Sequence, residues 1–163
     1  MQNERYKKDT LIYLSALQLM SVIIKPVAVA AAGMIDPQTQ KAWRSEFGQP
    51  GKVPLALIVN SLIELTELQP LRAILQETNK LLHWGYYLAF HRQNLAGTTD
   101  TLCKYTWQAY LYLEARDIEG FSTYLAICFS YILETIRDFI IQHGLQEAAK
   151  LATPYKIPDL NIK

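Results

Sequence analysis

The stretch STYLAICFSYILETIRDFIIQH, residues 122–143, decides the fold class of this chain. Its apolar side chains recur every three or four positions, which is the period of one face of an α-helix; they are Leu125, Cys128, Ile132, Ile136, Phe139 and Ile140. Gly144 follows at once, where a residue with left-handed backbone commonly ends a helix. The stretch therefore predicts a long amphipathic helix that ends at about His143.

The preceding segment, residues 101–115, predicts a helix that is apolar on most of its circumference. One side carries Leu102, Tyr105, Ala109 and Leu113, and the other sides carry Cys103, Trp107, Tyr110 and Leu111. A helix that is apolar all round must be covered on several sides. We expect it to be the central helix of the fold or half of an interface. Residues 116–120 predict a tight turn into the next helix.

Earlier in the chain, prolines predict where helices begin and end. We expect a first helix over residues 4–24, ending before Pro26, because a proline disfavours helical backbone in the preceding residue. Asp36 and Pro37 predict the start of a second helix, which reaches about Phe47. Pro54 opens a third helix. A fourth is expected over residues 71–95, with Pro70 either interrupting the third helix or opening the fourth.

Composition supports the same fold class over the whole chain. The 163 residues include 23 Leu and 15 Ile but only 5 Val, whereas strands favour β-branched residues such as Val and Thr. No repeat, low-complexity tract or linker divides the sequence. We therefore predict an all-α protein, residues 1–163 forming one domain: a bundle of about six helices with an extended tail over residues 153–163.

Residues 11–33 have two interpretations. They are apolar and follow a basic start, as in a signal peptide or membrane anchor. Gln18, Lys25 and Pro26 would all lie within the membrane span, which favours a buried helix of a soluble domain instead. On the first interpretation the protein is membrane-associated or exported. On the second, which we favour, it is cytoplasmic; we interpret Cys103 and Cys128 as reduced core residues, which also favours the cytoplasm.

Charge and motifs exclude several classes of function. The net charge of +1 gives no overall attraction to nucleic acid or to an anionic membrane. Phosphate-binding loops, a nucleophile elbow and HExxH are absent from the sequence, and no glutamate has a histidine three residues on, as di-iron bundles require. His83, Tyr87 and His91 share a helix face but lack further ligands. We expect no cofactor and no metal.

One short motif points to catalysis. Arg137-Asp138-Phe139-Ile140-Ile141-Gln142-His143 resembles the R-x(4–6)-H signature of HEPN-domain ribonucleases, which are all-helical. The resemblance implies RNA cleavage with Arg137 and His143 at an active site that a second copy of the chain completes. On a continuous helix the two side chains point about 120° apart. A site within one chain would therefore need a break in the helix, and the ordinary alternative is a surface arginine beside Glu134 and Asp138.

Aromatic residues are concentrated in the middle of the chain, where 12 of the 18 lie between His83 and Tyr131. Aromatic side chains dominate cores and interfaces, and the tips of Tyr and Trp prefer a polar partner. Three environments fit: plain core, a protein interface, and a pocket for an aromatic or lipidic ligand. The residues expected at the interface or pocket are Trp84, Tyr87, Tyr105, Trp107, Tyr110, Tyr112 and Tyr124.

These observations favour a non-catalytic helical subunit that acts by binding another protein or a second copy of itself through an aromatic-rich apolar surface. The first alternative is a HEPN-like ribonuclease that uses Arg137 and His143. The second alternative is a carrier of a small apolar or aromatic ligand. The net charge does not indicate nucleic acid as a partner. We do not expect a membrane as a partner on the favoured interpretation of residues 11–33.

Overall fold

A computed structural model describes residues 2–47, 54–82 and 98–144 of the chain. In these residues all regular structure is helical. The elements are α1 (Gln2–Ala31), the 3-10 turn η1 (Ala32–Met34), α2 (Pro37–Phe47), α3 (Leu55–Glu64), α4 (Gln69–Leu81), α6 (Thr98–Glu114) and α7 (Ile118–His143). The predicted all-α fold is confirmed. The tail over residues 153–163 lies outside the described residues.

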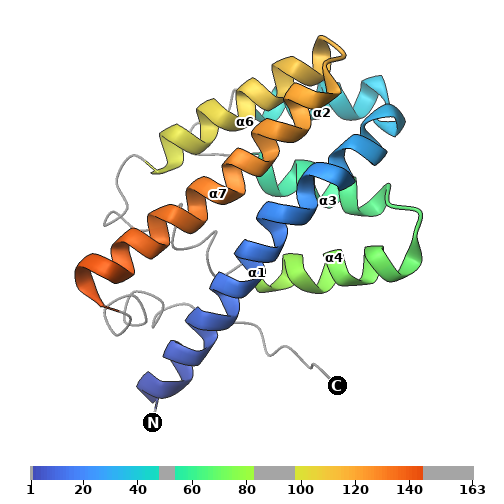
Figure 1. Cartoon of the computed structure of the whole chain (residues 1–163). Helices are drawn as coiled ribbons and strands as arrows, with labels where there is room; N and C mark the ends of the chain where they lie inside the picture. Colours follow the sequence, from blue (N-terminus) through green and yellow to red (C-terminus); the bar gives the residue numbers. More distant parts are fainter. Residues whose placement is uncertain (1, 48–53, 83–97, 145–163) are drawn as a thin grey trace.

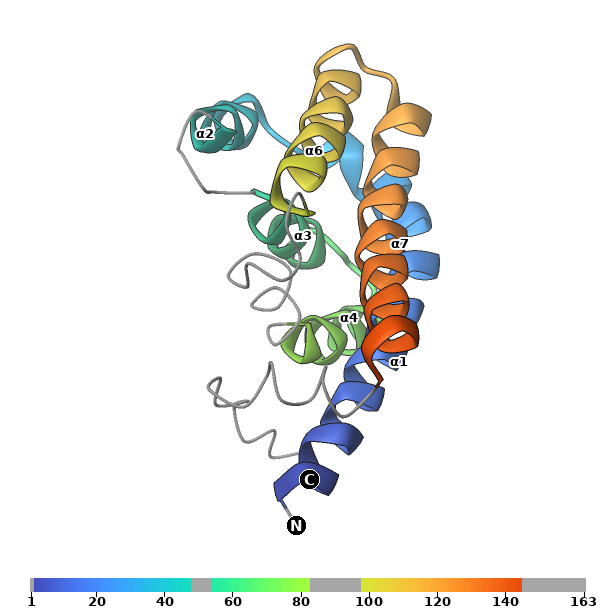
Figure 2. The same cartoon turned by 90° about the vertical axis from the view of Figure 1, so that its left-hand side faces the viewer.

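Three long helices form one layer of the bundle. α1 and α7 lie side by side and antiparallel, and α6 packs along the other side of α7 (Figure 1). α2, α3 and α4 form a second layer behind them, stacked from one end of the molecule to the other (Figure 2). One core of buried apolar residues runs through both layers, so the described helices pack as a single unit.

The core side of α1 shows why it packs along α7. Its buried residues recur at alternating intervals of three and four, and they include Tyr13, Leu17, Met20, Ile24, Val27 and Ala31. This spacing keeps one side of a helix against its neighbour. At the far end of the contact, Lys25 Nζ lies 2.7 Å from Glu119 Oε1 of α7.

The first helix is longer than predicted, because α1 continues through Pro26 to Ala31. Proline removes one hydrogen bond to the carbonyl four residues earlier, which here belongs to Val22. Val22 and Pro26 are both exposed, so water can satisfy that carbonyl. Val27 and Ala31 beyond the proline are buried in the core, and this burial offsets the cost of the lost hydrogen bond.

The start of α2 follows Asp36 and Pro37 as predicted, and the start of α4 decides between the two roles left open for Pro70. Asp36 Oδ1 accepts a hydrogen bond of 2.7 Å from the Thr39 backbone N–H, and this bond lowers the pKa of the Asp36 carboxyl. Pro70 lies in the first turn of α4, so it opens that helix. α4 ends at Leu81, whereas we predicted a helix to residue 95; residues 83–95 lie outside the described part.

The connection between α6 and α7 is shorter than predicted. α7 begins at Ile118 because Asp117 caps it, its carboxylate accepting a hydrogen bond from the Gly120 backbone N–H at 2.9 Å. Gly120 therefore belongs to the first turn of α7. Arg116 adopts a positive φ of 62°, which reverses the chain within three residues. At the other end, Gly144 ends α7 with a φ of 85°, as expected.

Candidate interaction surface

Four tyrosines from α6 and α7 form a continuous row, which we call the tyrosine row: Tyr105, Tyr112, Tyr124 and Tyr131. Each pair on one helix is seven residues, or two turns, apart, and the helices run antiparallel. The ring centroids of Tyr131 and Tyr105 are 5.6 Å apart, those of Tyr105 and Tyr124 are 6.4 Å apart, and those of Tyr124 and Tyr112 are 5.5 Å apart.

The four rings of the tyrosine row are half-buried. Within the described part of the chain, none of their hydroxyl groups has a hydrogen-bond partner. A half-exposed ring with a free hydroxyl offers apolar area and a polar group at a low cost in side-chain entropy, since Tyr has few rotatable bonds. The four rings pack against the core, and each leaves part of its surface exposed.

The surface around the tyrosine row carries no charge from its own helices. Residues 105–113 of α6 and 120–133 of α7 contain no Asp, Glu, Lys or Arg. One side of each segment is buried, and the opposite side is also uncharged. Exposed helix faces of soluble domains normally carry charged side chains, so this surface differs from an ordinary solvated face.

At one end of the tyrosine row, Gly120 makes the close approach of the helices possible. A Cβ atom on Gly120 would lie 2.5 Å from Cγ of Tyr112 and 2.6 Å from Cδ1. Tyr112 therefore lies directly over the glycine and reaches Tyr124 from there. We predicted that Gly120 lies in a turn, and it instead leaves room for an aromatic ring.

Tyr110 is not part of this surface. Its side chain is 2% exposed, and its hydroxyl donates a hydrogen bond of 2.7 Å to Glu114 Oε1. The same carboxylate oxygen lies 2.6 Å from Arg44 Nη1 of α2. Burial, with the hydrogen bond to Glu114 and its charge, raises the pKa of Tyr110 to about 12. We expected Tyr110 at an interface or pocket, and it instead joins α6 to α2 in the core.

Trp107 lies beside Tyr110, half-buried against α2. Its ring is stacked on that of Tyr110 with centroids 5.6 Å apart, and Phe47 packs edge-on at 5.0 Å from Trp107. An open groove of about 490 Å³ runs past this contact, lined by Arg44, Phe47, Cys103, Lys104 and Trp107. Trp107 thus belongs to the α2–α6 contact, separate from the tyrosine row. Trp84 and Tyr87 lie outside the described residues.

Arg137 and His143 occupy one uninterrupted helix, α7. Both side chains are exposed, and the His143 ring packs on Phe139 at a centroid distance of 4.7 Å. Six residues of continuous helix keep the two side chains about 120° apart. α7 therefore lacks the break that a site within one chain would need. Among the described residues, no three His, Cys, Asp or Glu side chains gather where they could hold a metal ion.

Cys128 is a buried thiol next to the row, with its Sγ 3.7 Å from Thr106 Oγ1. Burial raises its pKa from 9.0 to about 12. The thiol of the folded chain therefore stays protonated well above pH 9, whereas that of the unfolded chain ionises there. A raised pKa in the folded state contributes stability that is present below pH 9 and is lost as the pH rises toward 12.

We expect unfolding free energy to fall between pH 9 and pH 11 with a contribution from Cys128 of about 1.4 kcal/mol per pH unit. The raised pKa of Tyr110 also lowers the unfolding free energy as the pH rises above 10. Urea unfolding at pH 8, 9, 10 and 11 measures the slope. Cys128→Ala should have a shallower slope than the wild type, and equal slopes would contradict a buried thiol at this position.

Comparisons with models of known protein families, with curated proteins and with solved structures found no match to this chain. The described residues define it as an all-α bundle in two layers.

Proposed function

We propose that this protein is a non-catalytic interaction subunit that binds another protein chain, its own copies included, through the tyrosine row. The observation that carries the proposal is that α6 and α7 combine aromatic rings with a lack of charge on their outer side. Four half-buried rings with unpaired hydroxyls lie in contact on segments that have no charged residue. Interfaces are enriched in Tyr and depleted of charge at their centres.

The energy of such an interface would be concentrated in its rings. Tyrosine is among the residues that most often dominate binding, and the loss of one anchoring ring typically costs 2 kcal/mol or more. Tyr105 contacts two other rings of the row and Tyr131 contacts one. Tyr131, at the end of the row, can therefore be changed with the smaller disturbance to the other rings.

The test is a native mass measurement of the complex isolated from cells that make the protein, followed by the affinity of its components for each other. We expect at least one further chain in the complex. Tyr131→Ser should weaken the association by roughly tenfold or more, while Tyr131→Phe, which retains the ring, should weaken it less. Ile141→Ser is the matched control, because Ile141 is 80% exposed on the same helix and lies outside the row.

Two results would overturn the proposal. One is that the protein is isolated from cells without any partner and also stays a monomer at high concentration after purification. The other is an association that Tyr131→Ser and Ile141→Ser weaken equally, since this would place the interface elsewhere. Melting curves of both variants show whether each is still folded, so a loss of binding is read only from folded protein.

A further inference from the structure

A cavity of about 310 Å³ lies beside the last turns of α1. It is bounded by the last turns of α1, by η1, by the connection between α3 and α4, and by the start of α4 (Figure 1). Its walls are Ile23, Pro26, Val27, Ala30, Ala31, Met34, Leu65, Thr66, Glu67, Leu68 and Leu71.

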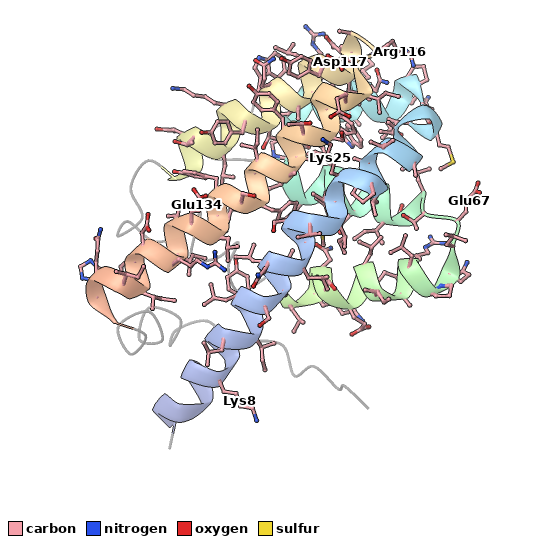
Figure 3. All side chains as sticks on the ribbon, viewed as in Figure 1. Lys8, Lys25, Glu67, Arg116, Asp117 and Glu134 are labelled. Atoms are coloured by element: carbon pink, nitrogen blue, oxygen red, sulfur yellow. The ribbon has the colours of Figure 1, made fainter. Side chains whose placement is uncertain are left out.

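The lining is aliphatic, with two polar side chains. The Thr66 hydroxyl donates to the Leu62 carbonyl at 2.9 Å, so it is already engaged. Glu67 is exposed, and its side chain points outward from the connection between α3 and α4 (Figure 3). Among the described residues, the lining therefore offers no free hydrogen-bond donor side chain and no cation. The cavity is partly open to solvent, and an aliphatic lining of this kind gives water few hydrogen-bond partners and accepts apolar molecules.

Charge near the cavity also favours an uncharged occupant. Between residues 10 and 35 the sequence has one charged residue, Lys25. Lys25 is bound to Glu119 on the α7 side of α1, away from the cavity. The charged group at the rim is the Glu67 carboxylate, which would repel an anionic head group. No described side chain of the lining could neutralise a carboxylate or a phosphate.

Size and shape restrict the occupant further. A dry cavity of about 150 Å³ holds one benzene molecule, so on that scale this cavity holds on the order of ten carbon atoms. None of the described residues in its walls is an aromatic ring on which a planar ligand could stack. The rim is formed by two exposed, flexible side chains, Met34 and Leu68, which can fold over a chain that enters.

We propose that this cavity binds a single uncharged, unbranched hydrocarbon chain of about ten carbon atoms. The site is independent of the tyrosine row, since the two share no residue. Binding comes from removing the chain from water, at about 0.8 kcal/mol for each methylene group buried. Affinity should therefore rise roughly fourfold with each added carbon and level off once the cavity is full.

Calorimetric titration of the wild-type chain with 1-hexanol, 1-octanol, 1-decanol and 1-dodecanol tests this proposal. We expect affinity to rise about 15-fold from hexanol to octanol, and to flatten between decanol and dodecanol. Decanoate should bind more weakly than decanol, because the described lining residues include no cation. A series without dependence on chain length, or decanoate binding as tightly as decanol, would overturn the proposal.

Two neighbouring variants test the location of the site. Ala30→Phe places a ring in the cavity from a position that is exposed in the wild type, and it should lower the affinity for decanol at least tenfold. Val29→Phe is the matched control, because Val29 is also exposed but does not line the cavity, and it should change the affinity less than twofold. Equal effects of the two variants would show that decanol binds elsewhere. Tyr131→Ser should leave decanol binding unchanged, whatever its effect on protein association.

Discussion

Replacing Leu17 with alanine should lower the unfolding free energy by about 3–5 kcal/mol. Leu17 has no exposed surface and lies in the core, on the buried side of α1. The substitution removes buried apolar atoms and leaves a cavity that the neighbouring side chains fill only in part. Natural domains are stable by only about 5–15 kcal/mol, so this one change removes a large share. Chemical denaturation with the linear extrapolation method measures it.

Leu19→Ala provides the matched control for Leu17→Ala. The chemistry of the change is the same and the site is two residues away, but Leu19 is 43% exposed on the outer side of α1. We expect it to cost less than about 1 kcal/mol, since much of the side chain is in water before the change. The pair therefore reports which side of α1 is packed.

The same pair separates the two interpretations of the N-terminal segment. Leu11–Met34 is the one segment in the described residues that is long and apolar enough to cross a membrane. If α1 is a core helix, Leu17→Ala should lower the unfolding free energy strongly and Leu19→Ala should lower it only slightly. If α1 were instead a removable or membrane-inserted segment, neither change would alter the stability of the remaining bundle, and equal small effects would contradict the packing of α1 on α7.

Local sequence signals predicted the ends of several helices. The start of α2 depends on two adjacent residues and is confirmed. The sequence left two roles open for Pro70, and the structure shows that it opens α4. The predicted end of the first helix before Pro26 is wrong, because the effect of a proline on a helix depends on its surroundings. A proline on the exposed side of a helix costs one hydrogen bond, and apolar burial beyond it can outweigh that cost, which one sequence position does not reveal.

The candidate site was predictable only in part. Tyr105, Tyr112 and Tyr124 were expected at an interface and are half-buried in contact with one another. Tyr131 was missed, although its spacing of seven residues from Tyr124 was visible in the sequence. Which tyrosines face outward depends on the register between α6 and α7 and on the position of α2. Both are tertiary features, and for that reason the burial of Tyr110 could not be foreseen.

Gly120→Ala should destabilise the folded chain by about 2 kcal/mol, because the new methyl group would overlap the base of the Tyr112 ring. The ring atoms that it meets are Cγ and Cδ1, close to the backbone, so the ring cannot turn away without a shift of α6 or a poorer side-chain rotamer. Alanine favours helix over glycine by up to about 1 kcal/mol, so a net loss of stability identifies the clash. Gly33→Ala is the control, since a Cβ atom there would meet nothing within 4 Å.

A double-mutant cycle with Tyr112→Ala shows whether the ring is the cause of that loss. Without the ring, the methyl group at position 120 has room, and only the helix preference of alanine remains. Gly120→Ala should then be neutral or stabilising in the Tyr112→Ala background, which gives a coupling energy of roughly 2–3 kcal/mol. Equal costs in both backgrounds would mean that Tyr112 does not lie over Gly120. Since Tyr112 reaches Tyr124 only from that position, the tyrosine row would then lack one of its ends.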